Sequence, residues 1–429
     1  MGGSGRAGFP SEKYHSNGDY LSGASREFML FSQNTIEADF LYPSGVQKMG
    51  CGTCGSWRTT SPMAEPLSKD PLGRLRVLYV SSLTPNHYGV YRLRALQRLS
   101  LTHVAALDTD LFPGPTGIVG KLQFRLQVGK WVERLNHAVF QAAEREGVTV
   151  LLCDKVLSLW PDTLRHLRQS GVITVDYVND NPFGPRRDPG WRLFRKAIPE
   201  FDLHAVPRIS SVIDFRNHGA REVTEIRFTY EPSIHFPPEQ APAAEKWSDS
   251  CRDRKVSFIG TPYDNRGDFL TKLWRDDVPV DVSGSRPHWE AALPADAFAA
   301  IFRSGALYGD AYREAIWRSR INLAFVTHSN RDQVAHKSFE ITACGGFLLA
   351  ERTPQHLACF REDEEAVFFS DFEECRAKIE RYLNDEPARA AIAAAGQRRA
   401  WTSGYDNDSM LRCLLSRAAE LLAARGVHI

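Results

Sequence analysis

The chain has 429 residues, of which 43% are hydrophobic and 24% charged, and its formal net charge is +1. This composition is typical of a soluble globular protein, and the length suffices for two domains with substantial cores. The balanced charge excludes a global attraction to nucleic acid, and no segment reaches the ~18 apolar residues of a membrane-spanning helix.

The N-terminus and the cysteines indicate a cytoplasmic protein. No basic segment followed by an apolar run opens the chain, so no secretory signal is predicted. The eight cysteines are scattered, several in apolar or helical contexts, which is typical of reduced thiols. Cys51 and Cys54 form a CxxC pair, but no second pair follows at a spacing that would complete a zinc site. Peripheral contact with a membrane surface is left open.

Residues 1–72 are rich in Gly, Ser, Thr and Pro without sustained periodicity, which predicts an irregular N-terminal extension. From residue 73 onward, apolar runs alternate with amphipathic stretches. We expect strands over 76–82, 103–107, 148–153, 173–177, 201–206 and 223–227, and helices over 90–99, 128–146, 158–169 and 209–218. Because continuous apolar strands alternate with helices, residues 73–235 are interpreted as a Rossmann-like domain with a parallel sheet.

A linker rich in Pro and Glu is predicted over 236–252. A second alternation follows, with strands over 255–261, 278–283, 321–325 and 366–369 and helices over 265–274, 308–318 and 371–400. It defines a second Rossmann-like domain over 253–404. The chain closes with a segment over 405–429 that carries a predicted helix, 409–425.

The stretch 336–350, HKSFEITACGGFLLA, predicts a helix, a tight turn and a buried strand. Glu340 lies in the helical part, and Gly345 and Gly346 form the turn, where glycine lets the backbone approach a ligand closely. Asp332 precedes Glu340 with seven residues between them. A carboxylate such as Glu340 can accept hydrogen bonds from two neighbouring hydroxyl groups of a sugar.

This stretch resembles the nucleotide-sugar site of GT-B glycosyltransferases, close to the glycosyl transferases family 1 group that includes the spore maturation protein B-like enzymes. The resemblance is carried, in order, by residues 338–354, 365–369, 382–383 and 392–396. It is specific over roughly residues 250–405 and weaker over 75–240. It implies an α/β fold in which two Rossmann-like domains face a central cleft and the last helix returns to the N-terminal domain.

The resemblance implies transfer of a sugar from a nucleotide diphosphate sugar, with UDP or GDP as the nucleotide, to an acceptor hydroxyl. No metal or other cofactor is required in this interpretation. The two acids favour retention of the anomeric configuration, whereas a dominant His87 would favour inversion. A non-catalytic protein that binds sugar nucleotides and a sugar-nucleotide epimerase are the alternatives. The sequence leaves open whether the acceptor is a saccharide, lipid-linked, a protein or a small molecule, and it leaves open the oligomeric state.

The resemblance places the donor on the second domain. Glu340 is expected to hold the ribose, with Asp332 near the donor sugar. Lys337 and Arg331 are candidate cations for the diphosphate. Gly345 and Gly346 are candidate donors of backbone N–H groups, with a plain turn as the alternative.

Three further donor-site candidates follow predicted strands of the second domain. Gly260 ends the first strand, where a phosphate or a loop can approach it closely. Arg266 lies on the following helix, and Gly284 ends the next strand, where the nucleotide base is expected.

The acceptor is expected on the first domain. His87 lies in a loop after the first strand and is a candidate general base, because its ordinary pKa is near neutrality. The alternative is a solvent-exposed loop histidine. Asp180 follows a strand and is either a base, an acceptor ligand or part of an Asx-turn before Pro182. Asp108 and Asp110 form a DxD, but no GT-A pattern surrounds them and no metal site is predicted.

Overall fold

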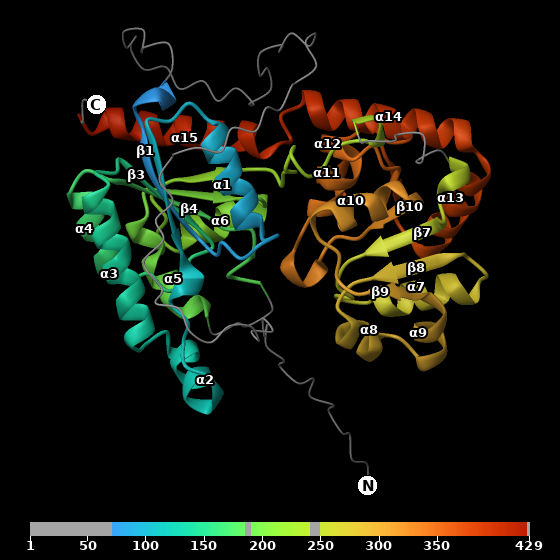
Figure 1. Ribbon diagram of the computed structural model, residues 1–429, viewed down its shortest axis with the longest axis horizontal. Coiled ribbons are helices and arrows are strands. Elements are labelled where there is room, and N and C mark those ends of the chain that lie inside the picture. Colours follow the sequence, from blue (N-terminus) through green and yellow to red (C-terminus); the bar gives the residue numbers. More distant parts are fainter. Residues whose placement is uncertain (1–70, 185–189, 241–248, 427–429) are drawn as a thin grey trace.

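The computed structural model of the chain describes residues 71–184, 190–240 and 249–426. They form two lobes, each built around one parallel sheet (Figure 1). Of the extension predicted over 1–72, residues 1–70 and the CxxC pair lie outside the described residues, whereas Leu72 is 1% exposed and packs in the core of the N-terminal lobe.

The N-terminal lobe contains a six-stranded parallel sheet. Its strands are β1 (Arg76–Ser81), β2 (His103–Asp108), β3 (Val150–Asp154), β4 (Ile173–Tyr177), β5 (Leu203–Val206) and β6 (Val223–Glu225), in the order β2-β1-β3-β4-β5-β6. Its helices are α1 (Tyr88–Arg98), α2 (Gly117–Leu126), α3 (Lys130–Arg145), α4 (Pro161–Gln169), α5 (Trp191–Ala197) and α6 (Ile209–Asn217). All six predicted strands are confirmed to within a few residues.

The C-terminal lobe contains a second six-stranded parallel sheet. Its strands are β7 (Arg254–Ile259), β8 (Val280–Ser283), β9 (Phe302–Ser304), β10 (Ser319–Ala324), β11 (Leu348–Glu351) and β12 (Val367–Phe369), in the order β12-β11-β10-β7-β8-β9. Its helices are α7 (Arg266–Arg275), α8 (Arg286–Ala292), α9 (Ala295–Ile301), α10 (Gly309–Trp317), α11 (His336–Ala343), α12 (Pro354–Cys359), α13 (Phe372–Asn384) and α14 (Glu386–Thr402). The predicted two-domain α/β plan is therefore confirmed.

Strand order fixes where a ligand can bind. In the first sheet the order reverses between β1 and β3, and in the second it reverses between β7 and β10. At such a reversal the loops after the two strands turn to opposite faces of the sheet and leave a crevice at the carboxyl ends. The loops that follow β1, β3, β7 and β10 are therefore the places to look for a site.

The last helix, α15 (Asn407–Ala424), returns to the N-terminal lobe as predicted (Figure 1). Its buried stripe of Leu411, Leu414, Leu415 and Ala418 repeats every three to four residues, and it shares a core with the β1 strand and α1. Asp406 caps the helix by accepting a hydrogen bond from Ser409 N at 2.7 Å. The chain therefore passes from the C-terminal lobe back to the N-terminal lobe at this helix.

The stability of the N-terminal lobe is predicted to depend on α15. Leu415 is fully buried in the shared core, whereas Arg412 on the same helix is exposed. Leu415→Ala should lower the free energy of unfolding by about 2–4 kcal/mol, because it leaves a cavity between α15 and the sheet. Arg412→Ala is the control and should change it by less than about 0.5 kcal/mol. Equal effects of the two changes in urea denaturation would contradict this packing.

Candidate active site between the lobes

Glu340 lies in α11 at the meeting point of the two lobes. Its side chain is 1% exposed. Tyr312 of α10 donates its hydroxyl to Oε2 at 2.8 Å, and Tyr88 of α1 donates its hydroxyl to Oε1 at 2.9 Å. Because Tyr88 belongs to the N-terminal lobe, one carboxylate is hydrogen-bonded by both lobes.

The Glu340 carboxylate is strongly held in its charged form. Burial alone raises the pKa of a carboxyl group, but the nearby His235, His336 and Lys337 and the hydrogen bond from Tyr312 lower the pKa of Glu340 to about 2. His235 Nε2 and His336 Nε2 lie 4.0 and 3.9 Å from Oε1. A buried anion of this kind is a ready acceptor for hydroxyl groups.

His336 begins α11 and ties it to the N-terminal lobe. Its ring stacks on Tyr88, with centroids 4.3 Å apart, and on Phe228, with centroids 5.1 Å apart. Its Nε2 donates to the carbonyl of Thr229 at 2.7 Å. The Tyr88 ring is thus fixed on one side by stacking and at its hydroxyl by Glu340.

His356 positions the start of α11, a role that the sequence analysis missed. Its Nε2 accepts from Ser338 Oγ at 2.9 Å and from Ala335 N at 3.3 Å, and its Nδ1 donates to the Glu351 carbonyl at 2.7 Å. The ring is fully buried, and burial lowers the pKa of His356 to about 4. These contacts join α12 to α11 over 18 residues, and no local sequence pattern announces them.

Asp332 also bridges the lobes. Its Oδ1 accepts from Arg208 Nε at 2.6 Å, and Asn330 Nδ2 lies 3.3 Å away. Arg208 belongs to the N-terminal lobe, where its side chain is 2% exposed. Burial raises the pKa of Asp332 against the opposing effect of Arg208. Oδ2 of Asp332 has no hydrogen-bond partner within the part of the chain that the structure describes.

Lys337 lies on α11 beside Glu340 and close to Gly260. Its ammonium group is 4.9 Å from the centre of the Tyr312 ring, and a Cβ on Gly260 would lie 3.2 Å from its Cε. Burial lowers the pKa of Lys337, while Glu340 opposes that change. No hydrogen bond or ion pair engages its ammonium group among the described residues, so this cation is available to a ligand.

Gly260 and Gly284 allow two strand ends to touch. A Cβ on Gly284 would lie 2.1 Å from the Gly260 carbonyl oxygen and 2.6 Å from Trp289 Nε1. Trp289 Nε1 donates to that same carbonyl at 3.0 Å. Of the two approaches expected at Gly260, a phosphate or a loop, the structure shows that of a protein segment, and Gly260 itself lies near Lys337.

Arg266 and Arg331 are both engaged by the protein. Arg266 is buried at the start of α7 and donates to the carbonyls of Thr261, Phe325 and Val326 at 3.0, 3.3 and 3.0 Å. It therefore joins the loops after β7 and β10, and its Nε has no partner within the described ranges. Arg331 is exposed and faces Asp214 of α6 at 3.5 Å.

Gly345 and Gly346 form the plain turn that was the alternative expectation for them. Both lie at the C-terminal end of α11, where Gly345 has φ of +70°. Gly345 N donates to the Thr342 carbonyl at 2.9 Å, and Gly346 N donates to the Ile341 carbonyl at 2.9 Å. These are the two bonds of a Schellman cap, so neither N–H group is available to a diphosphate.

His87 caps the N-terminus of α1. Its Nδ1 lies 3.1 Å from Gly89 N and 3.1 Å from the Ser82 carbonyl. Nδ1 thus faces one group that donates, the Gly89 N–H, and one group that accepts, the Ser82 carbonyl, so the two contacts favour opposite tautomers. The tautomer that accepts from Gly89 N carries its proton on Nε2, and in that form His87 offers a donor where a general base needs an acceptor. Desolvation lowers the pKa of His87, which favours a neutral ring, and the residue is exposed, as in the alternative expectation.

Asp180 lies in the loop after β4 and forms an ion pair with Lys155, which follows β3. The Asx-turn expected near Pro182 is present, but Asn181 makes it by accepting from Phe183 N at 2.9 Å. The backbone N–H of Asn181 donates to Asn330 Oδ1 of the other lobe at 2.9 Å. The ion pair with Lys155 holds Asp180 beside the loop after β3.

Asp108 and Asp110 organise the loop after β1. Asp108 Oδ1 accepts from Leu83 N and from Asp110 N, each at 3.0 Å. Asp110 Oδ2 accepts from Ser82 Oγ at 2.6 Å. Among the residues that the structure describes, no group of three or more His, Cys, Asp or Glu side chains is arranged to hold a metal ion.

A buried ion pair beside His87 was also missed by the sequence analysis. Arg92 of α1 donates Nε and Nη2 to Asp154 at 2.6 and 3.1 Å, and Tyr79 donates to the same carboxylate. The Arg92 guanidinium lies 4.5 Å from the centre of the Tyr177 ring. This cluster fixes the start of α1, and with it Tyr88, against the carboxyl end of β3.

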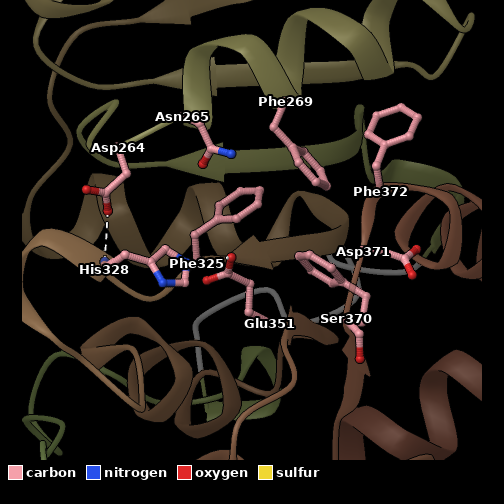
Figure 2. A pocket seen from close by; sticks show the side chains of 10 residues that line it. Asp264, Asn265, Phe269, Phe325, His328, Glu351, Ser370, Asp371 and Phe372 are labelled. Atoms are coloured by element: carbon pink, nitrogen blue, oxygen red, sulfur yellow. Dashed lines mark hydrogen bonds and ion pairs between the residues drawn. The ribbon is translucent and has the colours of Figure 1, made fainter.

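A pocket of about 550 Å³ opens at the carboxyl ends of β10, β11 and β12 (Figure 2). It is lined by Asp264, Asn265, Phe269, Phe325, His328, Glu351, Phe369, Ser370, Asp371 and Phe372. Phe325 and Phe369 belong to the core on one face of the sheet, whereas α11 packs in the core on the other face. None of the residues predicted to bind the sugar donor lines this pocket. The Asp264 carboxylate accepts a hydrogen bond from His328 N at 2.9 Å (Figure 2).

Comparisons with known proteins agree with this architecture. Residues 266–416 match the family described as "Glycosyl transferase-like". The chain is similar in structure to sucrose-phosphate synthase from Thermosynechococcus elongatus, with a TM-score of 0.59, 13% identity, and 81% of this chain and 100% of that chain covered. HepE from Anabaena in complex with UDP gives a TM-score of 0.56 at 10% identity, with 81% and 100% covered. No curated protein matches the sequence significantly.

A third solved structure supports the same fold. The UDP-forming α,α-trehalose-phosphate synthase from Burkholderia xenovorans gives a TM-score of 0.54 at 12% identity, with 81% of this chain and 99% of that chain covered. The two sheets and their similarity to these structures define the GT-B class. The chain therefore has a GT-B fold, and its residues 266–416 match a glycosyl transferase-like family. The closer relation to the spore maturation protein B-like enzymes stays a prediction.

The buried His356 predicts a pH dependence of stability. Its pKa is about 4 in the folded chain and near 6.5 when unfolded, so the unfolded chain binds the proton more readily. Stability from this group is complete above about pH 6.5 and is lost as the pH falls toward 4, by up to about 3 kcal/mol. His356→Gln should flatten the dependence in urea denaturation between pH 7 and 4.5. The exposed His166→Gln is the control, and an unchanged slope in His356→Gln would contradict this role.

Proposed function

We propose that the chain transfers a sugar from a nucleotide diphosphate sugar to an acceptor hydroxyl. Residues 253–404 bind the donor, and residues 73–235 bind the acceptor. The observation that carries the proposal is the buried, ionised Glu340, which faces the junction between the lobes beside the unpaired Lys337. UDP is the first nucleotide to test, because HepE and a trehalose-phosphate synthase are named with UDP or a UDP sugar.

Glu340 binds the ribose when a ribose hydroxyl replaces a tyrosine hydroxyl as the hydrogen-bond donor to its carboxylate. In the described conformation both carboxylate oxygens are occupied, by Tyr312 of the same lobe and by Tyr88 of the other. The two ribose hydroxyls offer the same donor chemistry as the tyrosine hydroxyls. The donor therefore displaces Tyr88 from Oε1, and Tyr312 remains on Oε2 or shares it.

Lys337 neutralises the diphosphate. It lies one helical turn from Glu340 on α11, and Gly260 leaves room at its Cε. Burial strengthens the attraction of a cation for a phosphate, because the site has a lower effective dielectric than water. Lys337 thereby stabilises the leaving diphosphate and supports a reaction in which the chain's own cations replace a metal.

The arrangement favours retention of the anomeric configuration. Inversion needs a base aligned with the acceptor hydroxyl, and the His87 tautomer that caps α1 presents a donor at Nε2. Asp332 has a free Oδ2 that can orient the donor sugar by accepting a hydrogen bond from a sugar hydroxyl. The leaving phosphate can then assist deprotonation of the acceptor on the same face.

Nucleotide binding tests the donor assignment directly. Glu340→Gln should weaken UDP binding roughly 10- to 100-fold in titration calorimetry, because it removes a charged acceptor of two hydroxyls. Lys337→Met should weaken UDP and UDP-sugar binding far more than uridine binding, because its partner is the diphosphate. Glu380→Gln on the exposed face of α13 is the matched control.

The donor assignment would be overturned by unchanged UDP affinity in a folded Glu340→Gln variant. A preference for GDP over UDP in the wild-type chain would replace the nucleotide and keep the site. Anomeric configuration is read from the product by NMR once an acceptor is found, and an inverted product would contradict the proposed stereochemistry.

A further inference from the structure

Exposed hydrophobic side chains gather on α2. Among the described residues, twelve large hydrophobic side chains are exposed, and six of them lie between residues 118 and 128. They are Ile118, Val119, Leu122, Phe124, Leu126 and Val128, with exposed fractions of 85, 61, 56, 42, 42 and 49%. A single exposed leucine needs no explanation, but a contiguous cluster of this size marks an interaction surface.

The cluster is ordered along the helix. Ile118, Leu122 and Leu126 recur every four residues and form one stripe, with Val119 beside it. Lys121 and Arg125, both exposed, recur at the same interval and flank this stripe. An apolar stripe bordered by cations is the pattern of a helix that lies in the interface of a membrane.

The charge around α2 is of one sign. From Leu111 to Val132 the sequence contains Lys121, Arg125 and Lys130 and no Asp or Glu. The neighbouring α5 adds Arg192, Arg195 and Lys196, all exposed, again without an acid in the helix. Because the whole chain carries a net charge of only +1, this concentration of cations is local and matches an anionic surface.

The helix is held firmly at its base. Gln127, which ends α2 with φ of 54°, is 2% exposed, and its Oε1 accepts from Ser158 Oγ at 2.5 Å. Its Nε2 donates to the Phe124 carbonyl at 2.8 Å. The apolar stripe is thus presented on a fixed support, and α2 projects from the N-terminal lobe (Figure 1).

The position of α2 links this surface to the cleft. The helix is inserted after β2, at the carboxyl edge of the sheet, and β2 pairs with β1, whose loop carries His87. A surface bound by α2 would therefore lie on the side of the lobe where the acceptor is expected. No helix among the described residues is long and apolar enough to cross a bilayer.

We propose that α2 docks the protein peripherally on a membrane surface that contains anionic lipids. Ile118, Leu122 and Leu126 enter the boundary between head groups and acyl chains, and Lys121 and Arg125 contact the lipid phosphates. The docking does not depend on the proposed transfer reaction. Where both hold, the acceptor half of the cleft faces the bilayer and the acceptor is a membrane-resident hydroxyl compound.

Vesicle sedimentation of the full chain tests the docking without any turnover. The wild type should bind phosphatidylcholine vesicles with about 30 mol% phosphatidylglycerol, and bind them less well as salt is raised. Leu122→Asp with Leu126→Asp should lower this binding at least about tenfold, because both side chains leave the apolar phase. Lys121→Glu with Arg125→Glu should remove the preference for anionic over pure phosphatidylcholine vesicles.

A matched control uses a second exposed pair with the same spacing. Ile209 and Ile213 on α6 are 57 and 55% exposed, so Ile209→Asp with Ile213→Asp makes the same chemical change elsewhere. This variant should bind vesicles as the wild type does. Unfolding curves establish that each variant is folded before it is compared.

Three results would overturn the docking proposal. One is an α2 variant, Leu122→Asp with Leu126→Asp, that binds vesicles as well as the wild type does. Another is an α6 variant that loses as much vesicle binding as the α2 variant. The third is a wild-type chain that binds no vesicles but self-associates in sedimentation equilibrium, with an α2 variant that is monomeric. That last result would assign the stripe to a contact between two copies.

Discussion

The buried carboxylate of Glu340 is the interaction on which the site depends. Removing a carboxylate from water is costly unless hydrogen bonds and positive charge compensate it. Here Tyr312 supplies a hydrogen bond from the same lobe and Tyr88 supplies one from the other lobe. His336, stacked on Tyr88, and His356, which fixes the start of α11, hold the groups around it. The two lobes therefore meet at the Glu340 carboxylate, and each lobe supplies a hydrogen-bond donor to it.

Phe228 packs in the apolar core that contains α11, but two further contacts between the lobes are polar, like those of Glu340. Asp332 pairs with Arg208, and Asn330 accepts from Asn181 N. Such contacts can be exchanged for those of a polar ligand at small cost, whereas an apolar seam would have to be exposed to water. In the proposed reaction, a nucleotide sugar offers hydroxyls for Glu340 and a diphosphate for Lys337. We therefore expect the junction to open and to close again around the donor.

The sequence predicted the two sheets because their strands are buried on both faces and appear as continuous apolar runs. It also predicted α11 and its turn, but it did not decide between a diphosphate site and a plain turn. Gly345 and Gly346 follow the C-terminal end of the helix, so their N–H groups cap it. Arg208 and His356 could not be found from the sequence, because each acts through a partner more than fifteen positions away. Helix α2 was missed because its apolar residues face outward, against the usual pattern.

A double-mutant cycle between Tyr88 and Glu340, read out by UDP affinity, tests the central claim that one carboxylate serves both the junction and the donor. Tyr88→Phe frees Oε1 of Glu340 and keeps the ring that stacks on His336. The account predicts that Tyr88→Phe strengthens UDP binding roughly 3- to 10-fold in the wild-type background. It predicts no such gain when Glu340 is already Gln. Weaker binding in Tyr88→Phe, or the same gain in both backgrounds, would contradict the account.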